Sequence, residues 1–183
     1  MTEKTTAMVV KTPGMLDWEV MQRQCVAFIS SGFLPDHIWK GCDKNTAIAK
    51  ALTIAQKGKE LGIPPLQAFS SITVIKGKPC LSAELMLALC FQRVRGFSAS
   101  FVTPPDKAAT ECTVIMKRQG GLPQHFKFTM DDAKNAGLLG NDVWRKYPAA
   151  MLRARVTSAA CRAVAPDAIM GCYTPEELGG PVL

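Results

Sequence analysis

The sequence predicts an α+β fold in which helices pack on an antiparallel β-sheet or hairpins. Apolar residues recur at helical spacing near both ends of the chain, whereas the middle contains short strand-like runs joined by glycine turns. Helices and strands do not alternate as they do in βαβ units. The 183 residues are enough for one domain with a buried core.

The N-terminal part of the chain is expected to form an arm followed by helices. Residues 1–14 are rich in threonine and lysine and end in Pro13-Gly14, which is typical of a flexible arm. Apolar spacing, a glycine stop and a proline pair place helices over residues 15–31, 45–61 and 66–69.

Strands dominate the middle part. The sequence predicts them over residues 72–75, 78–81, 97–103, 110–118 and 125–129. The first two form a hairpin whose turn glycine, Gly77, lies between Lys76 and Lys78. Ser82 is a good N-cap for a helix that reaches about residue 94 and is embedded in the sheet.

The C-terminal part returns to helices. Thr129 is expected to cap a short helix, and residues 138–147 to form a connector. Pro148 then opens a longer helix, 148–164. The predicted core domain therefore spans residues 15–174 and is followed by a tail, 175–183.

Basic residues outnumber acidic residues, 22 to 15, and the excess is concentrated in one part of the chain. Residues 111–165 carry nine basic and four acidic side chains, and five basic residues with no acid lie between Asp142 and Asp167. This is the electrostatic footprint of a polyanion-binding face, although a solvated helix surface gives the same pattern.

Composition predicts a cytoplasmic protein in a reducing compartment. No apolar run reaches the roughly 18 residues that span a membrane, and the N-terminus lacks a secretory signal. The seven cysteines are odd in number and never form a C-x-x-C pair. We therefore expect free thiols rather than a disulfide framework.

The motifs of several enzyme classes are missing. G-x-x-x-x-G-K-[ST] and G-x-G-x-x-G do not occur, and His37 and His125 lie in no metal-ligand or catalytic motif. Asp131-Asp132 suits a helix start, and the other acids are scattered. We expect a binding protein with no catalytic site, no metal and no cofactor. Carboxylates that meet only in space keep a metal-dependent nuclease as an alternative.

One helix face carries the residues best suited to bind phosphate. In the helix after Pro148, Arg155, Ser158 and Arg162 lie at i, i+3 and i+7 and so form one stripe. Guanidiniums two turns, or roughly 10 Å, apart can follow successive phosphates of an extended strand. Arg153 points elsewhere. A neighbouring apolar stripe is expected to pack on the sheet: Leu152, Val156, Ala159 and Ala163.

Two aromatic residues and further cations complete the predicted nucleic-acid interface. Trp144 and Tyr147 flank two cations, and rings beside charges hold single strands without sequence preference. An aromatic pair before a helix is more often a hydrophobic staple, and we favour packing for both rings. For Arg155 and Arg162 we favour phosphate contact. The other basic candidates are Arg145, Lys146, Arg153, Lys76, Lys78, Lys117, Arg118 and Lys127.

A longer pattern runs through the same region. Its residues are Phe128-Thr129-Met130-Asp131-Asp132-Ala133-x-x-Ala136-Gly137-Leu138, Trp144-x-x-Tyr147-Pro148-x-x-Met151-Leu152-x-x-Arg155, Arg162, Pro166-Asp167 and Gly171-x-Tyr173-Thr174-x-Glu176-Glu177. In this order they resemble the RecT/Beta family of phage single-strand annealing recombinases, and the resemblance covers about residues 45–178.

The resemblance implies a phage- or prophage-encoded protein of the bacterial cytoplasm that coats single-stranded DNA as a homo-oligomeric ring or helical filament. It implies annealing of complementary strands without ATP, through a partly unwound duplex intermediate. Arg155 and Arg162, and less closely Arg153, match basic residues on the family's DNA-binding helix. The Lys76/Lys78 hairpin sits where family members place a basic hairpin. The implied partners are a 5′–3′ exonuclease and the host's single-strand-binding protein.

Two departures from the family pattern bear on these expectations. Ala149 and Ala150 replace positions that are often basic, so the groove is expected to carry less charge. The chain ends soon after Glu177, where relatives continue into a region that recruits partners; a compact family member and a shortened chain both fit this end. A basic adaptor that binds DNA or protein without annealing is the main alternative function.

Overall fold

Helices and two small antiparallel sheets make up the structure, a computed structural model that describes residues 13–178. The α+β class predicted from the sequence is confirmed. The arm predicted for residues 1–14 lies outside the described residues except for Pro13 and Gly14, which begin the first helix. Within the described residues, no helix combines the length and the apolar character needed to cross a membrane.

From residue 13 onward, four helices precede the first strand. They are α1 (Pro13–Ser30), α2 (Asp36–Trp39), α3 (Lys44–Glu60) and α4 (Pro65–Ser71). Helix α2 is not among the predicted helices, because its four residues are too few to show a period. Asp43 caps α3: its side chain accepts hydrogen bonds from the backbone N–H groups of Asn45 and Thr46, at 2.9 and 3.1 Å.

Helices α3 and α4 approach each other closely at Gly58. A Cβ added at Gly58 would lie 2.5 Å from the Cβ of Ala68 and 3.2 Å from the carbonyl oxygen of Ile63. A glycine inside a helix costs about 1 kcal/mol relative to alanine. Here the close contact between the two helices requires it.

The first sheet is the predicted hairpin. It consists of β1 (Ile72–Ile75) and β2 (Lys78–Leu81), with Thr73 opposite Cys80. The turn residues Lys76 and Gly77 have φ angles of 50° and 75°, as a two-residue type I′ turn requires. The helix that follows, α5 (Ala83–Arg93), is capped as expected by Ser82, whose Oγ accepts a hydrogen bond from the backbone N–H of Leu85 at 3.2 Å.

The second sheet has the strand order β3–β4–β5 and is antiparallel throughout. Its strands are β3 (Ser98–Phe101), β4 (Glu111–Lys117) and β5 (Gln124–Thr129), with a short turn η1 (Pro105–Lys107) between the first two. Helix α5 separates this sheet from the hairpin rather than lying embedded in one sheet. Strand β4 buries Cys112, Val114 and Met116 on one face.

Helices and helical turns form the C-terminal part. They are α6 (Met130–Asn135), η2 (Leu138–Gly140), α7 (Asp142–Lys146), α8 (Pro148–Val164), α9 (Pro166–Ile169) and η3 (Pro175–Leu178). The cap predicted at Thr129 is present as a full capping box with Asp132. The connector expected over 138–147 is wrong, because Asn141 caps α7 through the N–H of Val143 and Trp144 anchors that helix in the core.

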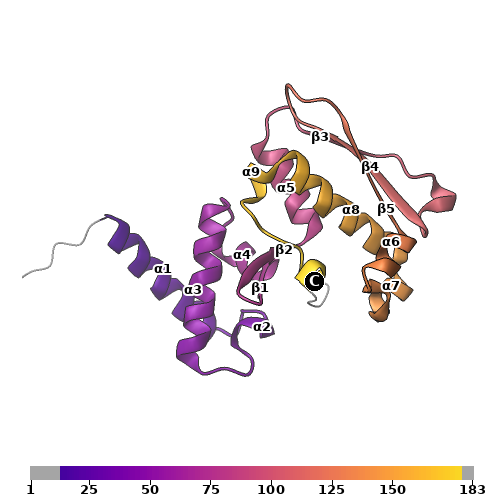
Figure 1. Cartoon of the computed structure of the whole chain (residues 1–183). Helices are drawn as coiled ribbons and strands as arrows, with labels where there is room; N and C mark the ends of the chain where they lie inside the picture. Colours follow the sequence, from indigo (N-terminus) through magenta and orange to yellow (C-terminus); the bar gives the residue numbers. More distant parts are fainter. Residues whose placement is uncertain (1–12, 179–183) are drawn as a thin grey trace, which may run out of the picture.

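Helix α8 packs against β4, β5 and α5, and it runs beside the three-stranded sheet in Figure 1. Leu152 and Val156 are buried as predicted. Ala159 and Ala163, expected on the same buried stripe, are exposed. They lie farther along the helix, so this stripe is covered only along its first half. The predicted stripe is therefore right at its start and wrong at its end.

Buried cysteines contribute to the core. All seven are free thiols, and six of them are buried. Burial raises the pKa of the Cys25 thiol to about 11, so this side chain is neutral and packs as a small apolar group.

We expect Gly58→Ala to lower the free energy of unfolding by about 1–3 kcal/mol, because the added methyl group meets the Cβ of Ala68. Gly140→Ala is the control, since a Cβ there meets nothing within 4 Å; it should be neutral or stabilise by up to about 1 kcal/mol. Urea unfolding measures both. Equal stability of Gly58→Ala and the parent chain would contradict the close approach of α3 and α4.

Candidate nucleic-acid interface

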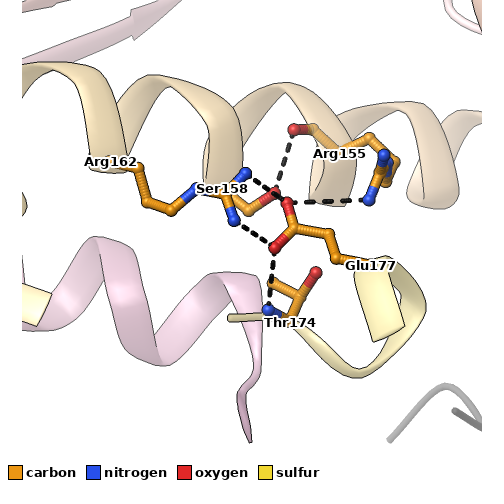
Figure 2. A network of polar contacts seen from close by, with 5 residues as sticks. All are labelled: Arg155, Ser158, Arg162, Thr174 and Glu177. Atoms are coloured by element: carbon orange, nitrogen blue, oxygen red, sulfur yellow. Dashed lines mark hydrogen bonds and ion pairs between the residues drawn. The ribbon is translucent and has the colours of Figure 1, made fainter. Parts of the chain in front are cut away.

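The arginine stripe of α8 faces the C-terminal segment of the chain. Arg155, Ser158 and Arg162 follow one another along the helix as the sequence predicts (Figure 2). Ser158 is fully buried, and the side chains of Arg155 and Arg162 are only 18% and 33% exposed. The two residues favoured for phosphate contact are therefore partly covered by the protein itself.

Backbone hydrogen bonds bring the C-terminal segment to this place. The N–H of Leu81 donates to the carbonyl oxygen of Tyr173 at 2.7 Å, and the N–H of Tyr173 donates to the carbonyl oxygen of Pro79 at 3.3 Å. The segment thus adds a parallel bridge to the edge of β2 before it turns toward α8. Figure 1 shows this last stretch passing between the hairpin and α8.

A local hydrogen bond sets the position of Glu177 at the end of this segment. The N–H of Thr174 donates to Glu177 Oε2 at 3.1 Å. Thr-x-x-Glu is the pattern of a capping box, in which the glutamate three residues along accepts from the first backbone N–H. The short turn η3 therefore holds the carboxylate of Glu177 in a fixed direction.

The carboxylate of Glu177 contacts every polar side chain of the stripe (Figure 2). Arg162 donates hydrogen bonds to it from both terminal nitrogens, from Nη2 to Oε1 at 2.6 Å and from Nη1 to Oε2. The hydroxyl of Ser158 donates to Oε1 at 3.1 Å, and Arg155 Nη1 lies 3.6 Å from the same oxygen. The Glu177 side chain is 9% exposed, so these contacts replace almost all of its water.

Charge in this cluster is not balanced. Among the described side chains, one carboxylate faces two guanidiniums, so these three groups carry a net positive charge. Arg155 Nη1 is buried and donates no hydrogen bond among the described residues, and its guanidinium lies 5.5 Å from the ring centre of Phe128. Arg155 therefore keeps hydrogen-bonding capacity that Glu177 does not use.

Tyr173 connects the hairpin to the same cluster. The amine of Lys78 lies 4.8 Å from the centre of the Tyr173 ring, and the guanidinium of Arg162 lies 5.5 Å from it. Cations at such distances interact favourably with the ring. Lys78 thus contacts Tyr173, Arg155 contacts Glu177, and Arg162 contacts both. We call these five residues the Tyr173 cluster.

Three other predicted cations are paired with acids. Arg118 forms a two-pronged ion pair with Asp167 at 3.0 and 3.1 Å, and its hydrogen bond lowers the pKa of that carboxyl. Lys127 lies 2.7 Å from Glu111 and lowers its pKa in the same way. The third pair, Arg145 with Asp142, is exposed, at 2.5 Å. Such surface pairs contribute little to stability.

The remaining predicted cations lie apart from the Tyr173 cluster or at its edge. Arg153 lies on another side of α8, with its guanidinium 3.8 Å from the ring centre of Phe101. Lys76 is exposed at the hairpin turn, next to Lys78 in the fold. Lys117 and Lys146 are exposed on β4 and α7. The structure therefore brings together Lys78, Arg155 and Arg162 but leaves the other candidates spread over the surface.

The two aromatic candidates have different environments. Trp144 is 2% exposed and packs against Phe128 with ring centres 6.4 Å apart, which is the packing role favoured for it. The packing role favoured for Tyr147 is wrong, because its ring is 64% exposed at the start of α8. Of the two rings, only Tyr147 is open to a stacking base.

The sequence alone predicts no role for Glu177, although this residue organises the site. The signal was present as Thr174-Pro175-Glu176-Glu177, a capping-box pattern that places a glutamate at a turn. No local pattern states that this carboxylate meets residues 15 and 19 positions earlier in the chain. Only the fold brings them together.

Comparison with known proteins assigns neither a family nor a function to the chain. No family model, curated protein or solved structure matches the chain. Among residues 13–178, no three or more histidine, cysteine, aspartate or glutamate side chains are grouped so that they could hold a metal ion.

We expect Trp144→Ala to destabilise the protein by about 3–5 kcal/mol, because it empties a buried site against Phe128. Tyr147→Ala removes an exposed ring and should change the free energy of unfolding by no more than about 0.5 kcal/mol. Guanidinium unfolding followed by circular dichroism compares the two. A loss at Trp144 no larger than the loss at Tyr147 would refute the packing role.

Proposed function

We propose that the chain binds single-stranded DNA and anneals complementary strands without nucleotide hydrolysis. The observation that carries the proposal is the convergence of Lys78 and Arg162, from two elements far apart in the sequence, on the ring of Tyr173. Arg155 lies on the same helix stripe as Arg162, and among the described side chains a single carboxylate, that of Glu177, faces both arginines. An excess of cations gathered this way suits a polyanion.

Annealing needs a surface that neutralises phosphates without hiding the bases. Two DNA strands repel each other through their phosphates, and lysine and arginine side chains that hold both backbones lower this repulsion. A guanidinium binds two phosphate oxygens at once, whereas a lysine amine acts as a mobile point charge. The exposed Lys76 extends the cationic surface along the hairpin turn, and Tyr147 offers a ring on which a base can stack.

The lysines of the hairpin give the cleanest test. Arg155→Ala or Arg162→Ala would leave the buried Glu177 carboxylate short of a partner, which costs about 3–5 kcal/mol in such pairs. A loss of DNA binding in these variants could therefore reflect a loss of structure. Lys76 and Lys78 are exposed and form no ion pair among the described residues, so their removal changes charge with little effect on the fold.

We expect Lys76→Gln/Lys78→Gln to weaken binding to a labelled single-stranded oligonucleotide and to flatten its salt dependence, because each lost phosphate contact removes about 0.7 from the slope of log K against log salt. Fluorescence anisotropy at several salt concentrations measures both. Lys44→Gln/Lys50→Gln, which removes two exposed lysines outside the candidate interface, is the matched control. If both double variants bind alike, the hairpin is not part of the interface.

Annealing itself separates the proposal from a basic adaptor. Without ATP and with metals chelated, the protein should accelerate pairing of two complementary oligonucleotides. It should also hold strands added one after the other more tightly than a preformed duplex. Equal binding to the preformed duplex, with no acceleration of pairing, would favour the adaptor and contradict annealing. Binding that does not depend on salt would refute the cationic interface altogether.

A further inference from the structure

We propose that Glu177 is a built-in competitor of DNA, occupying the position at Arg155 and Arg162 where a phosphate of the bound strand would lie. In this arrangement the segment Thr174–Leu178 is an autoinhibitory strap, and a strand reaches the arginines only when the strap moves away. The inference rests on the proposed function, because it concerns how single-stranded DNA gains access to the same cluster.

The donors around Glu177 are those that would bind a phosphodiester. On α8, both terminal nitrogens of Arg162 and the hydroxyl of Ser158 point at its carboxylate. A carboxylate and a phosphodiester each present two oxygens that share one negative charge, and the arginine fork fits both. Glu177 thus has the charge and the shape of the group that it would exclude.

The carboxylate and a phosphate cannot occupy this place together. Glu177 uses both Nη atoms of Arg162, and its side chain is 9% exposed. A phosphate brought beside it would meet a second negative charge within the same group of donors. Binding of one anion therefore requires the other to leave.

A phosphate could bind Arg155 better than Glu177 does. Its Nη1 lies 3.6 Å from Glu177 Oε1, an ion-pair distance beyond a hydrogen bond, and it is buried without an acceptor among the described residues. A buried donor of this kind is costly to leave unpaired. A phosphate reaching both arginines would supply the missing acceptor, while Glu177 is held back by its bond to Thr174.

The strap has a natural point of attachment. Tyr173 is held to β2 by two backbone hydrogen bonds, which fix the chain just before the strap. Beyond it, η3 has four residues, and Glu177 supplies its polar contacts with α8. Opening can therefore begin at Thr174 and leave the bridge at Tyr173 in place.

Glu177→Gln tests the inference directly. The amide keeps the size of the side chain and can still accept from Thr174, but it removes the negative charge. We expect it to bind a labelled oligothymidylate about 5- to 10-fold more tightly than the parent chain and with a salt slope steeper by about 0.7. Asp106→Asn, the same charge change at an exposed acid on η1, is the matched control and should shift affinity far less.

The outcomes separate the inference from the proposed function. If the parent chain binds and Glu177→Gln binds no more tightly than Asp106→Asn, the competitor role is overturned while single-strand binding stands. Weaker binding by Glu177→Gln would instead make Glu177 a residue that positions the arginines, which also overturns the competitor role. If no protein binds, Glu177→Gln included, the proposed function fails and the inference fails with it.

Hydrogen exchange on the parent chain gives a second measurement that needs no variant. The Thr174 amide donates to Glu177, so it should be protected in the free protein and should exchange faster when oligothymidylate saturates the protein. The amide of Leu81, which donates to Tyr173, should keep its protection. Unchanged protection of Thr174 in the complex would overturn the strap.

Discussion

The packing of helix α8 is the constraint on which the rest of the structure depends. Its apolar residues lie against β4 and β5 on one side and against α5 on another, so the helix cannot rotate without exposing Leu152 or Val156. This fixes the side that carries Arg155 and Arg162. Because the apolar face of α8 is buried in the core, Arg155 and Arg162 are turned toward the C-terminal segment. The packing of the helix therefore determines the charges at the site.

Glu177 then decides what those arginines do. Removing two guanidiniums from water is costly, and a buried pair is acceptable only when geometry and hydrogen bonds are good. The carboxylate provides this, with help from Ser158 and Thr174. The same contacts join α8 to the last turn and, through Tyr173, to the hairpin. One acid thus stabilises this arrangement and lowers the net positive charge of the cluster.

The sequence predicts most of the elements because their signals are local. The I′ turn at Gly77, the cap at Ser82 and the capping box at Thr129 are each set within a few residues. What it does not predict depends on tertiary contacts. Helix α7 requires the buried Trp144, and the arginine stripe meets an acid 15 residues farther along only after the chain has bridged to β2. The sequence shows which residues are basic, but it does not show which acids or rings these residues contact.

The most direct test of the central claim is a structure of the protein bound to single-stranded oligothymidylate. The account predicts phosphate oxygens at Arg155 and Arg162, in place of the Glu177 carboxylate, with Tyr173 still bridged to β2. A complex in which Glu177 keeps its contacts with Arg162 while the strand lies elsewhere would contradict it.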